Sequence, residues 1–242
     1  MRLTPFIILT LVCALVSTAC SNWPRNKAEQ GEADAQYELG VNYDKGRGGV
    51  LQDHAEAAKW YRAAADQGYT DAQYNLGSLY ADGLGVPQDH GQAAAWFRRA
   101  AEQGLRDAQF DLALLYDEGQ GVTRDPTEAA RWYRLAADQG LIDAILNLAI
   151  LYTEGGELER DYAEAMRLFR KGSELGDPEA QLAMARMYED GLGVEVNLIQ
   201  AYLWSNRALN NDNENALQTR DHVAGLMSPE QLDEARRLAI ER

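Results

Sequence analysis

Apolar and polar residues alternate along the chain with the period of an α-helix, in paired segments. In residues 71–104, spacings of i, i+4, i+7 and i+8 place four apolar residues on one helix face: Ala72, Leu76, Leu79 and Tyr80. A stretch with glycine and proline at 83–87 ends this helix, because both residues interrupt helices. A second apolar face follows it: Ala93, Trp96, Phe97 and Ala100. The pattern therefore predicts a helix–loop–helix unit.

The unit occurs five times at a nearly constant spacing. The glycine before each unit recurs in steps of 37, 36, 36 and 36 residues: Gly31, Gly68, Gly104, Gly140 and Gly176. A period of this size is typical of a solenoid, in which a repeat buries its apolar face only against its neighbours. We therefore predict an all-α fold, a right-handed α-solenoid of five helix-turn-helix repeats over residues 31–212, with a C-terminal helical cap over residues 213–242. This arrangement gives about twelve helices and no sheet.

Each second helix begins with a residue that can cap it. The cap column is Asp53, Asp89, Asp125, Asp161 and Asn197, and a glutamate or glutamine stands three residues after each of them. Such side chains accept hydrogen bonds from the free amides of a first helical turn. Seven residues after each cap, a large apolar residue predicts the core between the paired helices: Trp60, Trp96, Trp132, Leu168 and Trp204.

Together these columns resemble the Sel1-like repeat family, a relative of the tetratricopeptide repeats with a longer unit. The shared sequence motifs are, in order, A-x3-L-G-x2-Y, G-x-G-V, D-x2-(E/Q)-A-x2-W-(Y/F) and A-A-x-Q-G. The resemblance covers about residues 31–212, and many columns match at once. It weakens at 155–158, where Gly-Gly-Glu-Leu replaces the loop, and at 210–213, where Asn-Asn-Asp-Asn replaces the exit.

The first thirty residues predict a signal peptide and a tether. Residues 1–19 combine Arg2, an apolar run and small residues before Cys20, as signal peptides do. The apolar run is shorter than the roughly 20 residues that a membrane-spanning helix needs. Small residues directly before a cysteine resemble the bacterial lipobox, which implies that Cys20 receives a diacylglycerol and palmitate and that residues 20–30 form a lipid-anchored tether. A plain cleaved signal and a retained anchor are the alternatives.

The lipobox resemblance implies a lipoprotein of the bacterial cell envelope. Ser21, rather than aspartate, follows the cysteine, and the family's sorting behaviour then favours the outer membrane, with the repeats facing the periplasm. The formal net charge of −15 argues against a nucleic-acid partner, because phosphate binding depends on clustered lysine and arginine. We therefore expect membrane attachment through the N-terminal lipid and no nucleic acid.

Motifs for catalysis or metal binding are missing from the sequence. It contains no H-E-x-x-H, no phosphate-binding glycine loop and no nucleophile elbow. His54 and His90 share one column beside the cap aspartates, but adjacent repeats hold such positions about 10 Å apart, too far for one ion. We predict that both are exposed histidines at helix starts, and that the protein is no enzyme and has no catalytic, cofactor-binding or metal-binding residues.

Two functions from different classes fit these observations. The favoured one is an interaction scaffold tethered in the envelope, which binds a protein partner through the concave face of the solenoid. An accessory role in envelope polysaccharide export is a subtype of this function, suggested only by analogy with lipid-anchored helical-repeat proteins. The alternative is a hydrolase acting on β-lactams or peptidoglycan, since some secreted Sel1-like proteins have been linked to that chemistry.

The first helices carry a polar stripe that should face a groove, and the middle repeats interrupt it. Apolar residues replace polar ones at three positions: Leu114, Ile145 and Ile150. Asp111 and Asn147 would form a polar rim around them. An exposed apolar patch with such a rim is a candidate partner-binding site. The alternative is that repeats three and four pack differently and bury these residues.

A substitution tests the anchor. A Cys20→Ser variant should remain unlipidated, because the cysteine thiol is the atom that accepts the diacylglycerol. In a detergent phase separation, the wild-type protein should enter the detergent phase and the variant the aqueous phase. If both proteins enter the aqueous phase, the lipoprotein interpretation is wrong.

Overall fold

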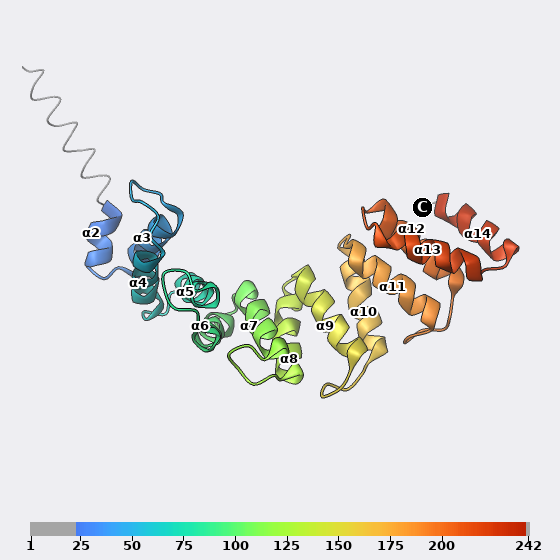
Figure 1. Cartoon of the computed structure of the whole chain (residues 1–242), viewed down its shortest axis with the longest axis horizontal. Helices are drawn as coiled ribbons and strands as arrows, with labels where there is room; N and C mark the ends of the chain where they lie inside the picture. The colour runs from blue at the N-terminus through green and yellow to red at the C-terminus, as the bar shows by residue number, and fades with distance from the viewer. Residues whose placement is uncertain (1–22, 241–242) are drawn as a thin grey trace, which may run out of the picture. The chain divides into compact units, whose positions relative to one another are not determined.

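Helices account for all regular secondary structure in the computed structural model, which describes residues 23–240 (Figure 1). Within these residues there are 13 helices and no strand, so the predicted all-α class is confirmed. The expected signal peptide over 1–19 and the expected lipidation site Cys20 lie outside the described residues. Among residues 23–240, no helix combines the length and apolarity needed to cross a bilayer.

The chain divides into two units, residues 1–124 and residues 125–242, and each is described by itself. The first unit contains α2 (Trp23–Glu29), α3 (Ala33–Lys45), α4 (His54–Ala65), α5 (Thr70–Asp82), α6 (His90–Glu102) and α7 (Arg106–Glu118). The second unit contains α8 (Pro126–Asp138), α9 (Ile142–Glu154), α10 (Tyr162–Glu174), α11 (Pro178–Asp190), α12 (Leu198–Asn210), α13 (Asn215–Leu226) and α14 (Pro229–Ile240). Within the units, eight of these helices form four of the five predicted pairs: α3 with α4, α5 with α6, α9 with α10, and α11 with α12.

The second helix of each repeat begins where the cap column predicts. Asp53 accepts hydrogen bonds from the amides of Ala55 and Glu56 at 3.0 and 3.1 Å. The other four cap residues also accept from the backbone of the first turn: Asp89, Asp125, Asp161 and Asn197. Asp212 stands in the column of the exit glycines and is the one non-glycine residue within 23–240 with a positive φ, 65°. The altered exit of repeat five therefore keeps the left-handed conformation.

The second glycine of the G-x-G loop marks a close contact with the preceding repeat. A Cβ atom added to Gly85 would lie 2.2 Å from the carbonyl carbon of His54, and one added to Gly121 would lie 2.2 Å from that of His90. Neither site has room for any side chain. In repeat four Glu157 occupies this loop position, so that loop lacks the glycine that the contact requires in repeats two and three.

The predicted core column is buried in the middle repeats. Trp96, Trp132 and Leu168 are 5%, 3% and 2% exposed. Trp60 and Trp204, in the first and last repeats, are only partly buried. The column is therefore a core column, and its burial is most complete in repeats two to four.

A buried glutamine in the first helix of most repeats bonds to the helix before it. Gln36, Gln73 and Gln109 each donate from Nε2 to a backbone carbonyl at 3.1 Å. The acceptors lie in the last turn of the preceding helix: Ala28, Ala65 and Ala101. Each of these carbonyls also accepts the amide of the exit glycine at 3.0 Å, so the glutamine adds a second hydrogen bond that joins the two helices.

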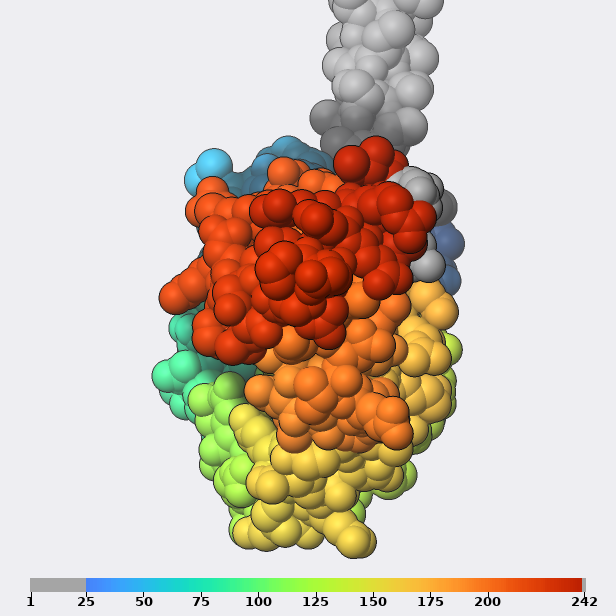
Figure 2. Space-filling view, turned by 90° about the vertical axis from the view of Figure 1, so that its right-hand side faces the viewer, coloured from blue at the N-terminus to red at the C-terminus, as the bar shows by residue number. Residues whose placement is uncertain are grey.

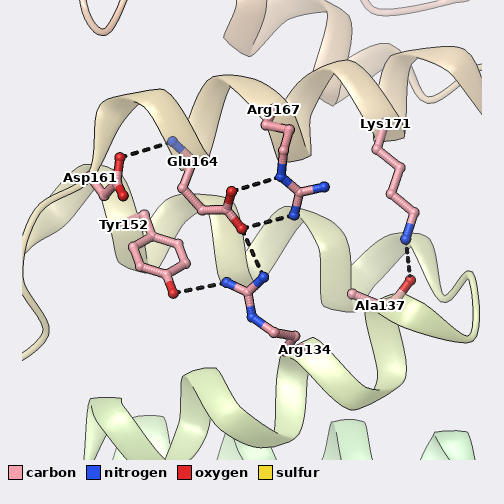
Figure 3. Close-up of polar contacts among 7 residues, drawn as sticks. All are labelled: Arg134, Ala137, Tyr152, Asp161, Glu164, Arg167 and Lys171. Carbon is pink, nitrogen blue, oxygen red and sulfur yellow. Dashed lines mark hydrogen bonds and ion pairs between the residues drawn. The ribbon is translucent and has the colours of Figure 1, made fainter.

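Repeat four replaces this bond with another. Ile145 stands in the glutamine column and has no polar atom on its side chain. Lys171 of α10 instead donates from Nζ to the carbonyl oxygen of Ala137 at 2.7 Å (Figure 3). Ala137 is the counterpart of Ala65 and Ala101, so the last-turn carbonyl keeps a donor although the glutamine is lost.

An arginine in the second helix of a repeat bonds to the tyrosine of the next repeat. The pairs are Arg62 with Tyr80, Arg98 with Tyr116, and Arg134 with Tyr152. In each pair the guanidinium also lies 5.6–5.7 Å from the centroid of the tyrosine ring. The tyrosine column, which the repeat pattern shows without a partner, therefore links successive repeats.

Around Arg134 this link extends to a third helix. Arg134 Nη1 lies 2.8 Å from Glu164 Oε1, and Arg167 donates to the same carboxylate from Nε at 2.7 Å and from Nη2 at 2.8 Å (Figure 3). The hydrogen bonds from Arg167 and Arg134 lower the pKa of Glu164 to about 2, against the opposing effect of burial. Glu164 therefore remains ionised to low pH and joins α8 to α10.

The two ends differ in how well the sequence predicted them. Residues 20–30 were expected as a tether, but residues 23–29 form α2, whose Ala28 is buried in a cluster with Ala35 and Leu39. At the other end, the predicted capping box is present. The Ser228 amide donates to Gln231 Oε1 at 3.0 Å, and the Gln231 amide donates to Ser228 Oγ at 3.2 Å. Figure 2 faces this end, where α13 and α14 (red) lie over α12.

The loop contact generates one prediction. Gly85→Ala and Gly104→Ala both place a side chain at positive φ, 69° and 91°, which costs about 1 kcal/mol in each case. Only Gly85→Ala also collides with backbone atoms, so it should lose a further 1–3 kcal/mol or so. Equal urea midpoints for the two variants would show that the close contact does not stabilise the fold.

The Glu164 cluster generates a second prediction. A carboxyl group with a lowered pKa stabilises the fold above its unfolded pKa, here 4.5, and this contribution disappears as the pH falls to about 2. Glu164→Gln should therefore destabilise the protein by about 1 kcal/mol at pH 7 and hardly at all near pH 2. Glu174→Gln, the same change at an exposed site on α10, is the control. Urea titrations at several pH values measure the difference, and a pH-independent loss would contradict the ion-pair explanation.

Candidate partner-binding grooves

Each unit has a groove between the first helices of two consecutive repeats. In the first unit the groove has a volume of about 320 Å³ and is lined from α5, α6 and α7. In the second unit the groove has a volume of about 470 Å³ and is lined from α9, α10 and α11. Residues two repeats apart line both: Ser78 and Ile150, Phe97 and Phe169, Leu115 and Met187. The grooves are therefore equivalent features of the repeat, and their chemistry differs with the sequence.

The groove of the first unit is acidic, and we call it the acidic groove. Its carboxylates come from the ends and middle of the first helices: Asp82, Asp111 and Glu118. Phe97 and Leu115 are buried and form its apolar floor. The groove therefore offers an apolar surface below and negative charge around it.

Asp111 is the least solvated of these carboxylates. The pKa of its carboxyl group is raised to about 6, mainly by burial, which a hydrogen bond with Tyr74 opposes and the charges of Asp107 and Asp82 assist. Burial also raises the pKa of the Tyr74 hydroxyl. The groove thus holds a carboxyl group whose negative charge is poorly compensated by its surroundings.

The groove of the second unit is lined mainly by apolar side chains, and we call it the apolar groove. Its apolar residues come from all three helices and the following loop: Leu146, Ile150, Phe169, Leu182, Met187 and Leu192. Five polar residues also line it: Asn147, Thr153, Glu179, Arg186 and Asp190. Ile150 is 43% exposed, although aliphatic side chains at surface sites of helices are usually replaced by polar ones.

The residues predicted as one partner site are divided between these grooves. Leu114 and Asp111 line the acidic groove, and Ile150 and Asn147 line the apolar groove. Each pair therefore lines a groove of its own unit. This agrees with the expectation that the stripe on the first helices faces a groove. Their role in binding a partner stays a prediction.

Ile145 does not belong to either groove, and its place in the predicted exposed patch was wrong. Its side chain is 0% exposed, and one of its methyl groups lies 3.8 Å from the position of a Cβ atom on Gly172. The reason is that the whole column is buried: Gln36, Gln73, Gln109 and Gln181 are at most 7% exposed. Because four of the five residues in this column are polar, the sequence suggested that the column lies at the surface. The glutamine side chains are instead buried and form hydrogen bonds within the protein.

The histidine column is also less exposed than predicted. His54 and His90 are both partly buried. His54 Nδ1 lies 2.9 Å from Asp44 Oδ1, whereas His90 Nδ1 is buried without a hydrogen-bond partner. Within residues 23–240, no three side chains of histidine, cysteine, aspartate or glutamate are grouped as a metal site would need.

The acidic groove brings a serine, a histidine and carboxylates together, but not as a catalytic set. Ser78 Oγ donates to the carbonyl oxygen of Tyr74 at 3.2 Å in its own helix. His90 Nδ1 has no hydrogen-bond partner, so no carboxylate orients the ring through this nitrogen. A nucleophilic serine needs a base that is itself oriented by a third group, and the hydrogen bonds of Ser78 and His90 do not provide this.

Several groove residues were missed from the sequence. Leu146 and Leu182 line the apolar groove and were not predicted there. Their signal was a change from aromatic residues in repeats one to three to leucine in repeats four and five: Tyr37, Tyr74, Phe110, Leu146 and Leu182. Asp82 stands on the polar stripe that was expected to face a groove, and Glu118 occupies the same column in the next repeat.

Comparison with solved structures gives two close matches. The chain is similar to c5321, a protective antigen present in uropathogenic Escherichia coli strains that displays an SLR fold, with 37% identity and a TM-score of 0.77 over 91% of this chain and 48% of that one. It is also similar to a Sel1 repeat protein from Oxalobacter formigenes, with 29% identity and a TM-score of 0.74 over 94% of this chain and 98% of that one. The chain thus spans about half the length of c5321. No curated protein matches the chain significantly.

The family model described as Sel1 repeat matches the chain five times without a gap. The matched stretches are residues 33–69, 70–105, 106–141, 142–177 and 178–213. Each stretch contains one pair of helices as the structure has them. The chain therefore belongs to the Sel1 repeat family.

Proposed function

We propose that this protein is a non-enzymatic scaffold of the bacterial cell envelope that binds a protein partner along the first helices of its repeats. Sel1 repeat proteins are generally scaffolds for protein interactions. The partner, the binding face and the envelope location are the content of this proposal. A lipid on Cys20 holds the protein at the outer membrane, facing the periplasm, and the signal-like residues 1–19 and Ser21 support this part.

The apolar groove is the observation that carries the proposal. It has a volume of about 470 Å³, and Ile150 at its side is 43% exposed. Protein interfaces concentrate their binding energy where an apolar side chain of one partner fills a pocket of the other. An apolar groove with Asn147 and Arg186 beside it has this composition, because polar groups around an apolar centre exclude water and fix orientation.

The repeat architecture supports binding rather than catalysis. In the first unit, the bond from Gln109 to Ala101 and the Arg98–Tyr116 pair hold the helices around the groove in place, so that surface is preformed. Ser78 and His90 in the acidic groove lack the contacts of a hydrolase. Among residues 23–240, no observation favours the β-lactam or peptidoglycan alternative over a scaffold.

Two matched substitutions test the proposal. Ile150→Asp places a charge in the apolar groove and should reduce partner binding at least about tenfold, because an unpaired charge must be desolvated in the complex. Leu135→Asp makes the same change on α8 at a site that lines neither groove; Leu135 is 39% exposed, close to Ile150. Leu135→Asp should bind like the wild type. Binding is measured by affinity capture from detergent-solubilised envelopes with quantitative mass spectrometry.

Circular dichroism provides the folding control for both variants. Equal melting temperatures show that any loss of a captured protein comes from the groove and not from unfolding. The proposal fails if every protein captured by the wild type is also captured at the same level by Ile150→Asp, or if Leu135→Asp loses the same partner.

A further inference from the structure

We propose that the acidic groove of the first unit binds the side chain of a lysine or arginine of a protein partner. This inference rests on the proposed scaffold function, because it names the chemistry of one contact that such a partner makes. It concerns only the first unit, and it is separate from the contact proposed for the apolar groove. Two features of the groove support it, its charge and its shape, and His90 beside the groove provides a probe.

The charge of the acidic groove is not neutralised by the protein. Asp82, Asp111 and Glu118 line it, and no lysine or arginine forms an ion pair with any of the three within residues 23–240. Glu118 accepts one hydrogen bond, from Gln120 at 2.6 Å. A cleft lined by charges of one sign attracts a partner of the opposite sign. The complementary group is therefore a cation.

The shape of the groove favours a cation on an apolar stem. Leu114 and Ala81 line its sides, and Phe97 and Leu115 lie buried below them. Lysine and arginine bury their methylene groups against apolar surface while the charged end stays among polar groups. The volume of about 320 Å³ admits one such side chain. A free metal ion would make no use of the apolar floor.

His90 supplies an observation that does not depend on the carboxylates. Its Nδ1 atom is buried and has no hydrogen-bond partner, although buried polar atoms nearly always have one. In repeat one the equivalent atom, His54 Nδ1, lies 2.9 Å from Asp44 Oδ1. Ala81 stands where repeat one has Asp44, and Ala81 lines the groove.

Repeat two therefore lacks the carboxylate that bonds to the histidine of repeat one. The Nδ1 atom of His90 is itself shielded from solvent, but the residue lines the groove, so its signals can report a group bound there. A second copy of this chain is a poor source of the cation, because each copy carries a net charge of −15.

Histidine signals provide a direct test, because the chain has only 3 histidines. The full chain is labelled with ¹³C and ¹⁵N at histidine, purified in detergent micelles and titrated with the peptide Ac-Gly-Ala-Lys-Ala-Gly-NH₂. Binding through one side chain should be in the millimolar range, about 1–10 mM. We expect the ring signals of His90 to shift with saturation, while those of His54 and His222 stay constant. The same peptide with Nε-acetyl-lysine should cause no shift.

Charge-matched variants show whether the carboxylates bind the peptide. Asp82→Asn combined with Glu118→Gln should weaken the binding about fivefold, because two exposed charge contacts are lost. Asp66→Asn combined with Glu102→Gln removes the same charge from exposed sites of the first unit that do not line the groove, and it should leave the binding unchanged. Circular dichroism confirms that both double variants remain folded.

The inference is overturned if the His90 signals do not shift, if the acetylated peptide shifts them equally, or if both double variants bind with the wild-type affinity. Its failure is distinguishable from failure of the scaffold function. If His90 does not respond but a captured partner still depends on Ile150, the scaffold stands and only the acidic groove was misassigned. If His90 responds and no partner depends on Ile150, the cation site stands and the apolar groove was misassigned.

Discussion

The hydrogen bond from the first helix of a repeat to the last turn of the helix before it is the contact on which the packing of repeats one to three depends. Gln36, Gln73 and Gln109 each make this bond at 3.1 Å. The carbonyl that accepts it also accepts the amide of the exit glycine at 3.0 Å, so the glutamine adds a second bond that joins two helices. In repeat four Ile145 cannot make this bond, and Lys171 donates to the carbonyl of Ala137 at 2.7 Å instead.

This constraint leaves the groove positions free to vary. The loop glycines and the arginine–tyrosine pairs link neighbouring repeats, and the cap residues fix the start of each second helix. These positions are therefore constrained by the fold. The residues between successive first helices have no such task, so they differ from repeat to repeat. One groove carries Asp82, Asp111 and Glu118, and its counterpart two repeats later carries apolar side chains. One framework thus presents two different surfaces.

Much of the fold was predictable because a repeated pattern constrains every element five times over. The paired helices, the five caps and the buried Trp96 and Trp132 follow from periodicity and local hydrogen bonding. The candidate site was predicted only in part. Leu114, Asp111, Asn147 and Ile150 do lie beside grooves, because their column faces outward in every repeat. Ile145 does not, because residue type alone cannot show whether a glutamine column is bonded to water or to a buried carbonyl.

The sequence by itself determined the helices, their ends and the repeat unit, since these depend on spacing and on contacts within a few residues. The tertiary structure alone decided which side chains meet across repeats. It joined Tyr152 of one repeat to Arg134 of another, separated the predicted patch into two grooves, and left His90 without the partner that His54 has. The residues that meet are far apart along the chain: 18 positions for Arg134 and Tyr152, and 10 for His54 and Asp44. Over such separations the periodicity shows which helix face a residue occupies but not which side chain lies beside it.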